Sequence, residues 1–435
     1  MNNVPMSNPE MMLACHKPFA HTRGACIALR SGRIAVCSGK SLGYSDDGGM
    51  TWSDPMESLY PDGEAPNIAN LVELSDGTLG GVAFRSGSNY RHDLEPTYND
   101  PAGLHKTQGY FSVLEDWGKT WSAPAPMLPG YPMPATAFQN ALIRTSSGRL
   151  LQPVYFSIGK GRWHQPGAPF AGGWADGEFT TTDAHYYDPH FGGSYVIYSD
   201  DEGKSWQPNR DGELFILPEY GGRQVKAMEP SVVEVESNKL LMFLRSQLGR
   251  VFQSWSYDNG ETWSHAQPTH LAASNSPDIV TKLPSTGHLL AVWNQHGERE
   301  IRQGYIRTRL SAAVSRNGGG IWEFFQNVES LHEQRHVEPG PIRITQPEGA
   351  YAVHAGLPAH ENESEYVVEL DEGYDRWTNH SVCALKDRVL IIYGGRCKIL
   401  AVDWFYRGRD SQSGDLRQTS GSSLLKKLQD QCPPL

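Results

Sequence analysis

The sequence predicts an all-β fold, a six-bladed β-propeller whose blades are four-stranded antiparallel sheets with aspartate turns. Two observations support this prediction. One short turn motif occurs five times in 435 residues, and six pairs of apolar runs alternate with it. Self-similarity over several tens of residues indicates a repeat architecture, and repeated four-stranded units are typical of propellers. The 45 glycines and 29 prolines agree with short strands and tight turns.

The repeated turn has the pattern Ser-x-Asp-x-Gly-x-Thr-Trp and first occurs as SDDGGMTWS at 45–53. A turn aspartate can accept hydrogen bonds from backbone N–H groups, and glycine tolerates positive φ. We expect the closing tryptophan to pack between neighbouring sheets on the outer part of its blade. We therefore interpret the motif as structural; its aspartate place is held by Asp47, Asp116, Asp201, Asp258 and, with a substitution, Asn317, and its last place by Trp52, Trp121, Trp206, Trp263 and Trp322.

Each repeat also contains two apolar runs joined by a tight turn, such as SVVEVESNKLLMFLR at 231–245. The runs barely alternate between apolar and polar residues, which predicts strands buried on both faces. The pattern places the blades at about 21–55, 64–124, 135–209, 226–266, 274–325 and 376–408, in a single domain that covers 1–435. The last unit lacks the aspartate turn, so we expect a strand near 10–20 to complete it and close the ring.

Three stretches interrupt this regularity, at 86–108, 157–193 and 323–376. The first two follow the second strand of a blade and are expected to be long loops. Long loops on a rigid scaffold often carry function.

Composition excludes several classes of protein. The net charge of −11 argues against non-specific binding of nucleic acid, which needs a basic face. No stretch has the ~18 apolar residues that cross a membrane, and the first residues lack the pattern of a secretion signal. The six cysteines form no CxxC pair, and four of them lie in apolar runs, so we expect free thiols and a cytoplasmic location. A secreted protein whose leader has been removed is the alternative. The oligomeric state is left open.

The first strand of a propeller blade lines the central channel, and charged residues are unusual there. The residues that open the six inner strands are Arg23, Ile68, Gln139, Glu229, Pro277 and Asn379. Arg245 ends the strand that follows Glu229, Arg85 holds the equivalent place in the second blade, and Arg307 precedes the third strand of the fifth. Guanidinium groups that converge in an acidic protein indicate a site for an anion, most simply a carboxylate. Unrelated structural ion pairs are the alternative.

The aspartate turns, the blade pattern and the stretch EPSVVEVESNKLLMFLRS resemble the sialidase (neuraminidase) superfamily over nearly the whole chain. The resemblance implies that Arg23, Arg245 and Arg307 hold the carboxylate of a sialic acid. It also implies that Glu229 is the glutamate that polarises a tyrosine nucleophile. A sialoglycan or another acidic sugar is then the expected substrate, with no cofactor and no metal, and Arg85 and Gln139 are further candidates for contact with it.

Two departures from the family pattern alter the expected chemistry. Asn379 or His380 stands where the family has its tyrosine, and the loop SGKS lacks the family's acid/base aspartate. Either Glu229 activates a water and the reaction inverts the anomeric centre, or His380 or a loop residue replaces the tyrosine. The acid must then come from a loop, with Asp93 and His92 as the first choice. Asp183, His185 and Tyr186 are the second choice.

Two functions therefore remain, an exo-acting glycosidase specific for sialic acid or a related 2-ulosonic acid, and a non-catalytic propeller that binds an acidic sugar. The retained Glu229 favours the enzyme, and the missing tyrosine and aspartate favour the binding protein. A further motif, HEQRH at 332–336, matches the HExxH zinc pattern, and 324–336 could be helical by periodicity. The VEPGP that follows would end such a helix, and no third ligand is evident, so we expect no zinc site.

Overall fold

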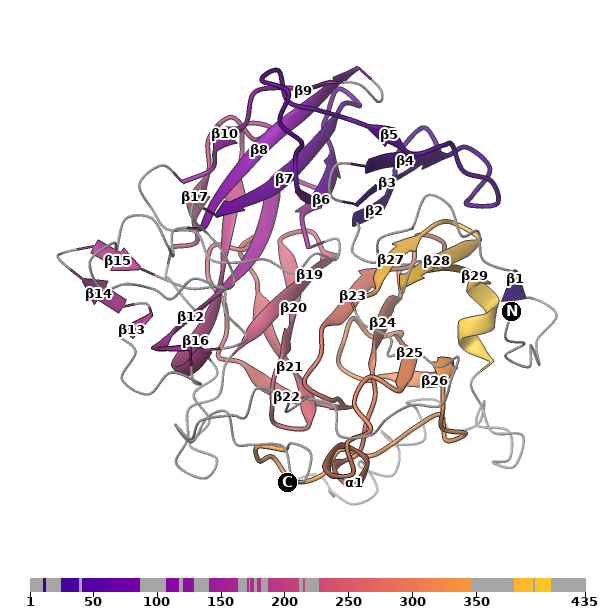
Figure 1. Cartoon of the computed structure of the whole chain (residues 1–435). Helices are drawn as coiled ribbons and strands as arrows, with labels where there is room; N and C mark the ends of the chain where they lie inside the picture. Colours follow the sequence, from indigo (N-terminus) through magenta and orange to yellow (C-terminus); the bar gives the residue numbers. More distant parts are fainter. Residues whose placement is uncertain are drawn as a thin grey trace, which may run out of the picture.

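In the computed structural model, six antiparallel sheets surround one centre, as the sequence predicts (Figure 1). The structure describes residues 11–12, 25–38, 41–86, 107–116, 120–128, 141–162, 170–171, 173–175, 178–180, 187–210, 214–215, 227–345, 379–393 and 396–407. Within these residues no helix is long and apolar enough to cross a membrane.

Blades 1 and 2 are built in chain order from the inside outward. Blade 1 contains β2 (Ala25–Ala28), β3 (Ile34–Ser38), β4 (Ser41–Ser45) and β5 (Met56–Glu57). Blade 2 contains β6 (Ile68–Glu73), β7 (Leu79–Ser86), β8 (Thr107–Asp116) and β10 (Ala125–Pro126), with β9 (Thr120–Trp121) also paired to β8.

Blade 3 carries the insertion at 157–193. Its sheet contains β11 (Ile143–Arg144), β12 (Leu150–Arg162), β16 (Tyr187–Ser199) and β17 (Gln207–Pro208), joined by β13 (Phe170–Ala171) and β18 (Leu214–Phe215). A separate hairpin consists of β14 (Gly173–Ala175) and β15 (Glu178–Thr180). The insertion is therefore not simply a loop, because β12 and β16 continue to pair as far as Arg162 and Tyr187.

Blades 4, 5 and 6 carry the described residues that lie at the end of the channel discussed below. Blade 4 contains β19 (Met228–Glu236), β20 (Lys239–Arg245), β21 (Arg250–Ser256) and β22 (Gln267–Ala272). Blade 5 contains β23 (Asp278–Lys282), β24 (Leu289–Asn294), the short helix α1 (Glu298–Arg302), β25 (Arg309–Ser315) and β26 (Glu323–Ser330). Blade 6 contains β27 (Ser381–Ala384), β28 (Arg388–Tyr393) and β29 (Arg396–Ala401), followed by the 3-10 helix η1 (Val402–Tyr406).

The ring closes through the N-terminal strand β1 (Met11–Met12). This strand pairs antiparallel with β29, with Met11 opposite Leu400 and Met12 opposite Ile399. Figure 1 shows it as the outermost strand of the blade that the C-terminal part of the chain forms. The expectation that a strand near 10–20 completes the sixth blade is confirmed.

The aspartate turns have the predicted hydrogen bonds. In the first turn, Asp47 accepts from the backbone N–H of Thr51 at 2.8 Å and from its hydroxyl at 2.6 Å. Trp52 Nε1 donates to the carbonyl of Gly49 at 2.9 Å. Gly49 has a φ of +91°, and a Cβ there would lie 2.6 Å from Leu390 of blade 6. The glycine is thus needed both for the turn and for close packing against the neighbouring blade.

The hydrophobic core lies between the blades. One cluster between blades 4 and 5 joins Val233 and Leu241 to Val280, Leu289 and the fully buried Trp293. All six residues of β24 are buried, as are six of the seven in β20. The weak alternation of the apolar runs was therefore correctly interpreted as burial on both faces.

Antiparallel order places the loops of each blade at two opposite ends of the channel. The inner strand of a blade begins, and its second strand ends, at one end, which we call the upper rim. The aspartate turns join the third and fourth strands at the other end. Five residues lie at the upper rim: Glu229 near the start of β19, Arg245 at the end of β20, Asp278 at the start of β23, and Arg307 and Asn379 just before β25 and β27.

The helix considered for 324–336 does not form. Residues Glu323–Ser330 are the strand β26, which pairs antiparallel with β25. Pairing with the open edge of β25 satisfies the backbone of this segment, and this tertiary interaction overrides the helical periodicity. The HEQRH motif follows the strand in an irregular segment, so its two histidines are not one helical turn apart.

Candidate functional site

A buried ion pair joins two of the residues that the sequence singled out. Arg245 Nη1 lies 2.7 Å from Glu229 Oε2, and the side chains are 3% and 10% exposed. Arg245 Nε also donates to Asn275 Oδ1 at 2.8 Å. The pair forms because β19 and β20 are antiparallel neighbours, with Met228 directly opposite Arg245. A charge-assisted bond of this length between buried groups fixes the guanidinium in one orientation.

Asp278, the first residue of β23, is a third ionisable group, which interacts electrostatically with Arg245 and Glu229. It is 3% exposed, and neither of its carboxyl oxygens accepts a hydrogen bond from the described residues. Burial raises the pKa of its carboxyl well above the usual value; the positive charge of Arg245 opposes this shift and the negative charge of Glu229 adds to it. Sequence reasoning missed this residue, although an aspartate at the start of the apolar run DIV was a signal that could have found it.

Arg307 and Asn379 lie at the upper rim of blades 5 and 6. Arg307 is 7% exposed and Asn379 is partly exposed. Both have positive φ, 60° for Arg307 and 48° for Asn379, and Glu229 has a φ of 42°. Left-handed backbone is costly for a residue with a side chain and concentrates at functional sites. The other such residues that the structure describes are Phe324 in β26 and three turn residues, Glu202, Asn238 and Asn259.

His380, the other candidate at the tyrosine place, points between the blades. It is fully buried, and its Nε2 donates to the backbone carbonyl of Val292 in β24 at 2.7 Å. Burial lowers the pKa of His380 to about 4, and the charge of Arg307 shifts it in the same direction. The imidazole is therefore neutral near pH 7 and ties blade 6 to blade 5. We assign it no chemical role.

A hydrogen-bonded network supports the backbone next to Arg307. The hydroxyl of Thr308 lies 2.9 Å from Nε2 of His296 and 3.0 Å from Nε2 of His332. Glu300 of α1 accepts two hydrogen bonds from the buried Arg309, at 2.7 and 2.8 Å. Burial lowers the pKa of His296 to about 3, so this ring is also neutral near pH 7.

The HEQRH motif thus contributes His332 to a structural network. Its second histidine, His336, stacks on Phe325 with a centroid distance of 4.0 Å. No group of three His, Cys, Asp or Glu side chains within the described part of the chain is arranged to hold a metal ion.

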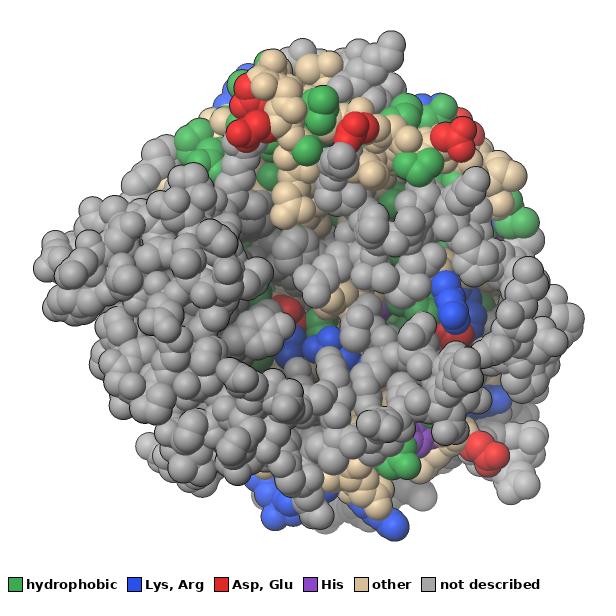
Figure 2. Space-filling model, viewed as in Figure 1, with side chains coloured by type: hydrophobic (Ala, Val, Ile, Leu, Met, Phe, Trp, Pro, Cys, Tyr) green, Lys and Arg blue, Asp and Glu red, His purple; other side chains and the backbone are tan. Residues whose placement is uncertain are grey.

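Several predicted site residues lie outside the described residues: Arg23, Gln139, His92, Asp93, Asp183, His185 and Tyr186. The backbone of Arg85 belongs to β7 and pairs with Gln108, while its side chain is outside the description. Of the predicted carboxylate clamp, the structure therefore describes Arg245 and Arg307. Figure 2 shows the face on which the centre of the molecule is hollowed, with acidic and basic side chains at the bottom of the hollow.

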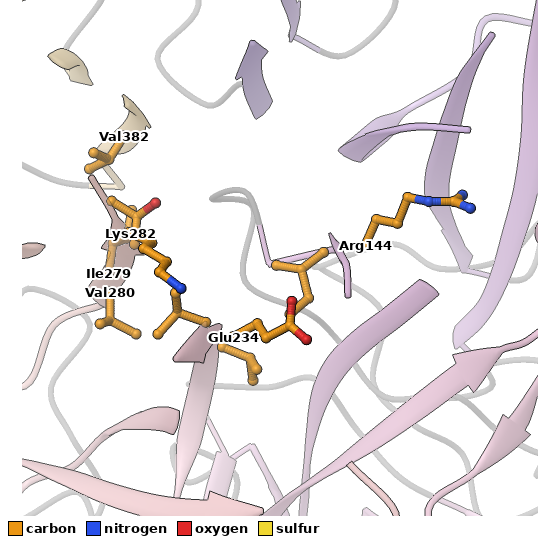
Figure 3. A pocket seen from close by; sticks show the side chains of 10 residues that line it. Arg144, Glu234, Ile279, Val280, Lys282 and Val382 are labelled. Carbon is orange, nitrogen blue, oxygen red and sulfur yellow. The ribbon is translucent and has the colours of Figure 1, made fainter. Parts of the chain in front are cut away.

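A cavity of about 270 Å³ lies further along the channel, among the inner strands of blades 3 to 6 (Figure 3). Its walls include Ile279, Val280 and Val382. Its charged groups already have partners: Arg144 Nη2 lies 2.6 Å from Glu202, and Lys282 Nζ donates to the carbonyl of Val235 at 2.8 Å. The cavity is lined by residues in the middle and far part of β19 and by every residue of β23 after Asp278, but not by Glu229, Arg245 or Asp278, and we do not regard it as the functional site.

Comparison with solved structures identifies the same fold in sialidases. The Hadza microbial sialidase Hz136 is 14% identical with a TM-score of 0.52, over 88% of this chain and 66% of that chain. The Trypanosoma rangeli sialidase in complex with the inhibitor DANA is 13% identical with a TM-score of 0.50, over 95% and 59%. A protein of unknown function from Dyadobacter fermentans is 16% identical with a TM-score of 0.48, over 91% and 96%.

The likenesses to the two sialidases concern the fold. The chain spans 66% of the length of the first sialidase and 59% of the second. A family model described as a BNR repeat-like domain matches residues 96–367, more than half of the sequence. The six blades and their repeated aspartate turns agree with that match, and the chain belongs to the family of BNR repeat-like domains.

Proposed function

We propose that this protein is an exo-acting, sialidase-like glycoside hydrolase that removes a terminal α-linked sialic acid or a related 2-ulosonic acid. The observation that carries the proposal is the buried pair of Glu229 and Arg245 at the upper rim of the channel. A buried arginine beside a carboxylate, on the same rim of the channel as two further residues with left-handed backbone, is unusual for a purely structural channel lining.

Arg245 and Arg307, with Arg23, would hold the substrate carboxylate. The planar guanidinium of an arginine matches the two oxygens of a carboxylate. In a 2-ulosonic acid this carboxylate is attached to the anomeric carbon, so holding it also fixes the scissile bond. Positioning of this kind lowers the barrier for a reaction through an oxocarbenium-like transition state.

Glu229 would act as the base. A substrate carboxylate that binds Arg245 competes with Glu229 for the guanidinium, and this competition would release Glu229 to accept a proton from water. Asn379 is not nucleophilic, and His380 is engaged with Val292, so attack by water with inversion is the reaction that these residues support. The acid that protonates the leaving oxygen would come from Asp93 or His92.

The alternative is a non-catalytic propeller that binds an acidic sugar. The ion pair itself favours this alternative in one respect, because it gives Glu229 a structural partner and thus a reason to be present without catalysis. The absence of the family's tyrosine and aspartate favours it further.

The experiment is incubation with aryl α-glycosides of sialic acid, of its deaminated form and of 3-deoxy-octulosonic acid, followed by release of the aryl alcohol. We expect turnover of at least one compound and its loss in Glu229→Gln. Arg316→Gln is the matched control, because Arg316 forms an exposed ion pair with Glu323. Binding of the free sugar acids without release of alcohol from any compound would support the non-catalytic alternative.

A further inference from the structure

The burial of Asp278 in its present position costs free energy. A carboxyl group without hydrogen-bond partners loses its hydration on burial and gains nothing in return, unless a ligand, a water or a function compensates. Both oxygens of Asp278 are inaccessible and have no partner among the described residues, whereas its register partner across the sheet is the apolar Trp293. Packing therefore gives no reason for a carboxyl group at this position.

The position of Asp278 is tied to that of Glu229. The backbone N–H of Val280 in β23 donates to the hydroxyl of Ser231 in β19 at 3.2 Å. Val280 is two residues beyond Asp278, and Ser231 is two residues beyond Glu229. The bond therefore aligns the beginnings of the two inner strands and brings both carboxyl groups to the same level of the channel.

Among the described residues, few charges act on Asp278 from the elements around it. Strand β19 presents Glu229 and β20 presents Arg245, and these are the two charges that shift its pKa. Strand β24 is uncharged along its length, and at the start of β27 stands His380, which is neutral near pH 7 because burial lowers its pKa to about 4. The cluster thus contains one cation and two carboxyl groups. Glu229 takes the bond to Arg245, and Asp278 has no such bond.

We propose that Asp278 is a positioning residue of the anion site, present as a neutral carboxylic acid in the working protein, and that its ionisation sets the alkaline limit of anion binding by Arg245. With Asp278 neutral, the charge of Glu229 balances that of Arg245, and an incoming carboxylate meets no second negative charge. With Asp278 ionised, the added charge repels the carboxylate and competes for the guanidinium. The inference deepens the function proposed above and rests on its anion-binding part, not on hydrolysis.

The test is the pH dependence of sialic acid binding, measured by calorimetry for the wild type and for Asp278→Asn. Asparagine has nearly the shape of the neutral acid and cannot ionise. We expect similar affinities at acidic pH. On raising the pH, the wild type should lose affinity by about tenfold, the change that one pKa unit of coupling produces, and Asp278→Asn should not. Asp403→Asn is the control, an exposed aspartate in η1 whose replacement should keep the wild-type profile.

Difference infrared spectroscopy supplies a second readout that needs no turnover. The wild type near pH 7 should show the carbonyl stretch of a protonated carboxylic acid that Asp278→Asn lacks. Parallel loss of affinity in the wild type and Asp278→Asn, or absence of this band, would overturn the proposal. Binding with the expected pH profile but no cleavage of any glycoside would refute the hydrolase and leave the role of Asp278 intact. Absence of binding of sialic acid, of its deaminated form and of 3-deoxy-octulosonic acid at every pH would overturn both.

Discussion

At the scale of single residues, the ability of the site to bind an anion depends on the ion pair between Glu229 and Arg245. Glu229 could be selected from the sequence because a charged residue is unusual at the start of an inner strand, and Arg245 because it ends the strand that follows. Their direct contact could not be predicted. The contact has a functional consequence, since an anion that binds Arg245 must compete with Glu229. The contact also limits the substitutions that can test the site. Removing the charge of one member of a buried ion pair leaves the charge of the other without a partner, which destabilises the protein.

Arg245→Lys is the substitution that keeps the charge. We expect binding of sialic acid to weaken by about tenfold to a hundredfold, because an ammonium group cannot supply the planar fork that matches a carboxylate. The thermal unfolding midpoint should change much less, since Lys can still neutralise Glu229. Titration calorimetry and thermal unfolding measure the two effects, and undiminished binding would remove Arg245 from the anion site.

Glu229→Gln separates catalysis from binding. Turnover should be lost because the amide cannot accept the proton of the attacking water, while sialic acid binding should remain intact or become tighter because a competing charge next to Arg245 is gone. In the wild type, NMR of the first product released from an α-glycoside should show the β anomer, as inversion requires. Initial release of the α anomer, or full activity in Glu229→Gln, contradicts this mechanism.

Asp278→Asn should also change stability. The pKa of Asp278 is raised in the folded protein, so its contribution is fully present below the unfolded-state pKa and is lost as pH rises toward the folded-state value. The variant does not have this loss. Its free energy of unfolding should therefore exceed that of the wild type near neutral pH, by about 1.4 kcal/mol for each pH unit between the unfolded-state pKa of the aspartate and the pH of the measurement, as long as the folded-state pKa lies above that pH. Urea denaturation at acidic and neutral pH measures the difference, and an equal or lower stability of the variant at neutral pH would contradict the expectation.

At the scale of secondary structure, the sequence was sufficient to predict elements that depend on residues close in the chain. It was not sufficient for elements that depend on contacts with other strands. The aspartate turns and the doubly buried inner strands follow from turn residues and apolar runs. The strand β26 could not be distinguished from a helix, because its backbone partner β25 comes from elsewhere in the sheet. Asp278 was missed for the same reason. The sequence analysis took its neighbour Pro277 as the residue that opens the inner strand of blade 5. The hydrogen bond between Val280 and Ser231 shows which residues of β19 and β23 lie at the same level.

The aspartate turns allow a test of an element. Hydrogen bonds from Thr51 lower the pKa of Asp47 to about 2. Asp47→Ala removes the acceptor and should destabilise the protein by about 1 kcal/mol, whereas Asp47→Asn should cost less, because Asn317 accepts an equivalent bond from the N–H of Ile321 at 2.8 Å.

The difference in stability between the wild type and Asp47→Asn should also depend on pH. Since the pKa of Asp47 is depressed on folding, its stabilising charge is present above the unfolded-state pKa and is lost as pH falls through the folded-state pKa. Thermal unfolding of both variants at neutral and acidic pH measures these effects. Equal costs for alanine and asparagine at neutral pH would show that the acceptor is not what stabilises the turn.

At the scale of the whole molecule, the site depends on closure of the ring. Glu229, Asp278, Arg307 and Asn379 belong to three successive blades, 4, 5 and 6, and each blade is held mainly by its neighbours. His380 and Val292 join blades 5 and 6 directly at the upper rim. A change in the position of blade 6 therefore moves Asn379 relative to the other site residues.

The short strand β1 is the element that tests this dependence. The pairs that the structure describes between it and β29 are formed by Met11 and Met12, so removal of residues 1–12 should expose the edge of β29. We expect a lower thermal unfolding midpoint, more self-association through the exposed edge strand and weaker binding of sialic acid. Removal of residues 1–9 is the matched control, because it shortens the chain but keeps both methionines. Unfolding scans, light scattering and calorimetry report the three effects. If the longer deletion matched the control in all three, blade 6 would hold its place without β1, and the geometry at Asn379 would not depend on closure of the ring by the N-terminal strand.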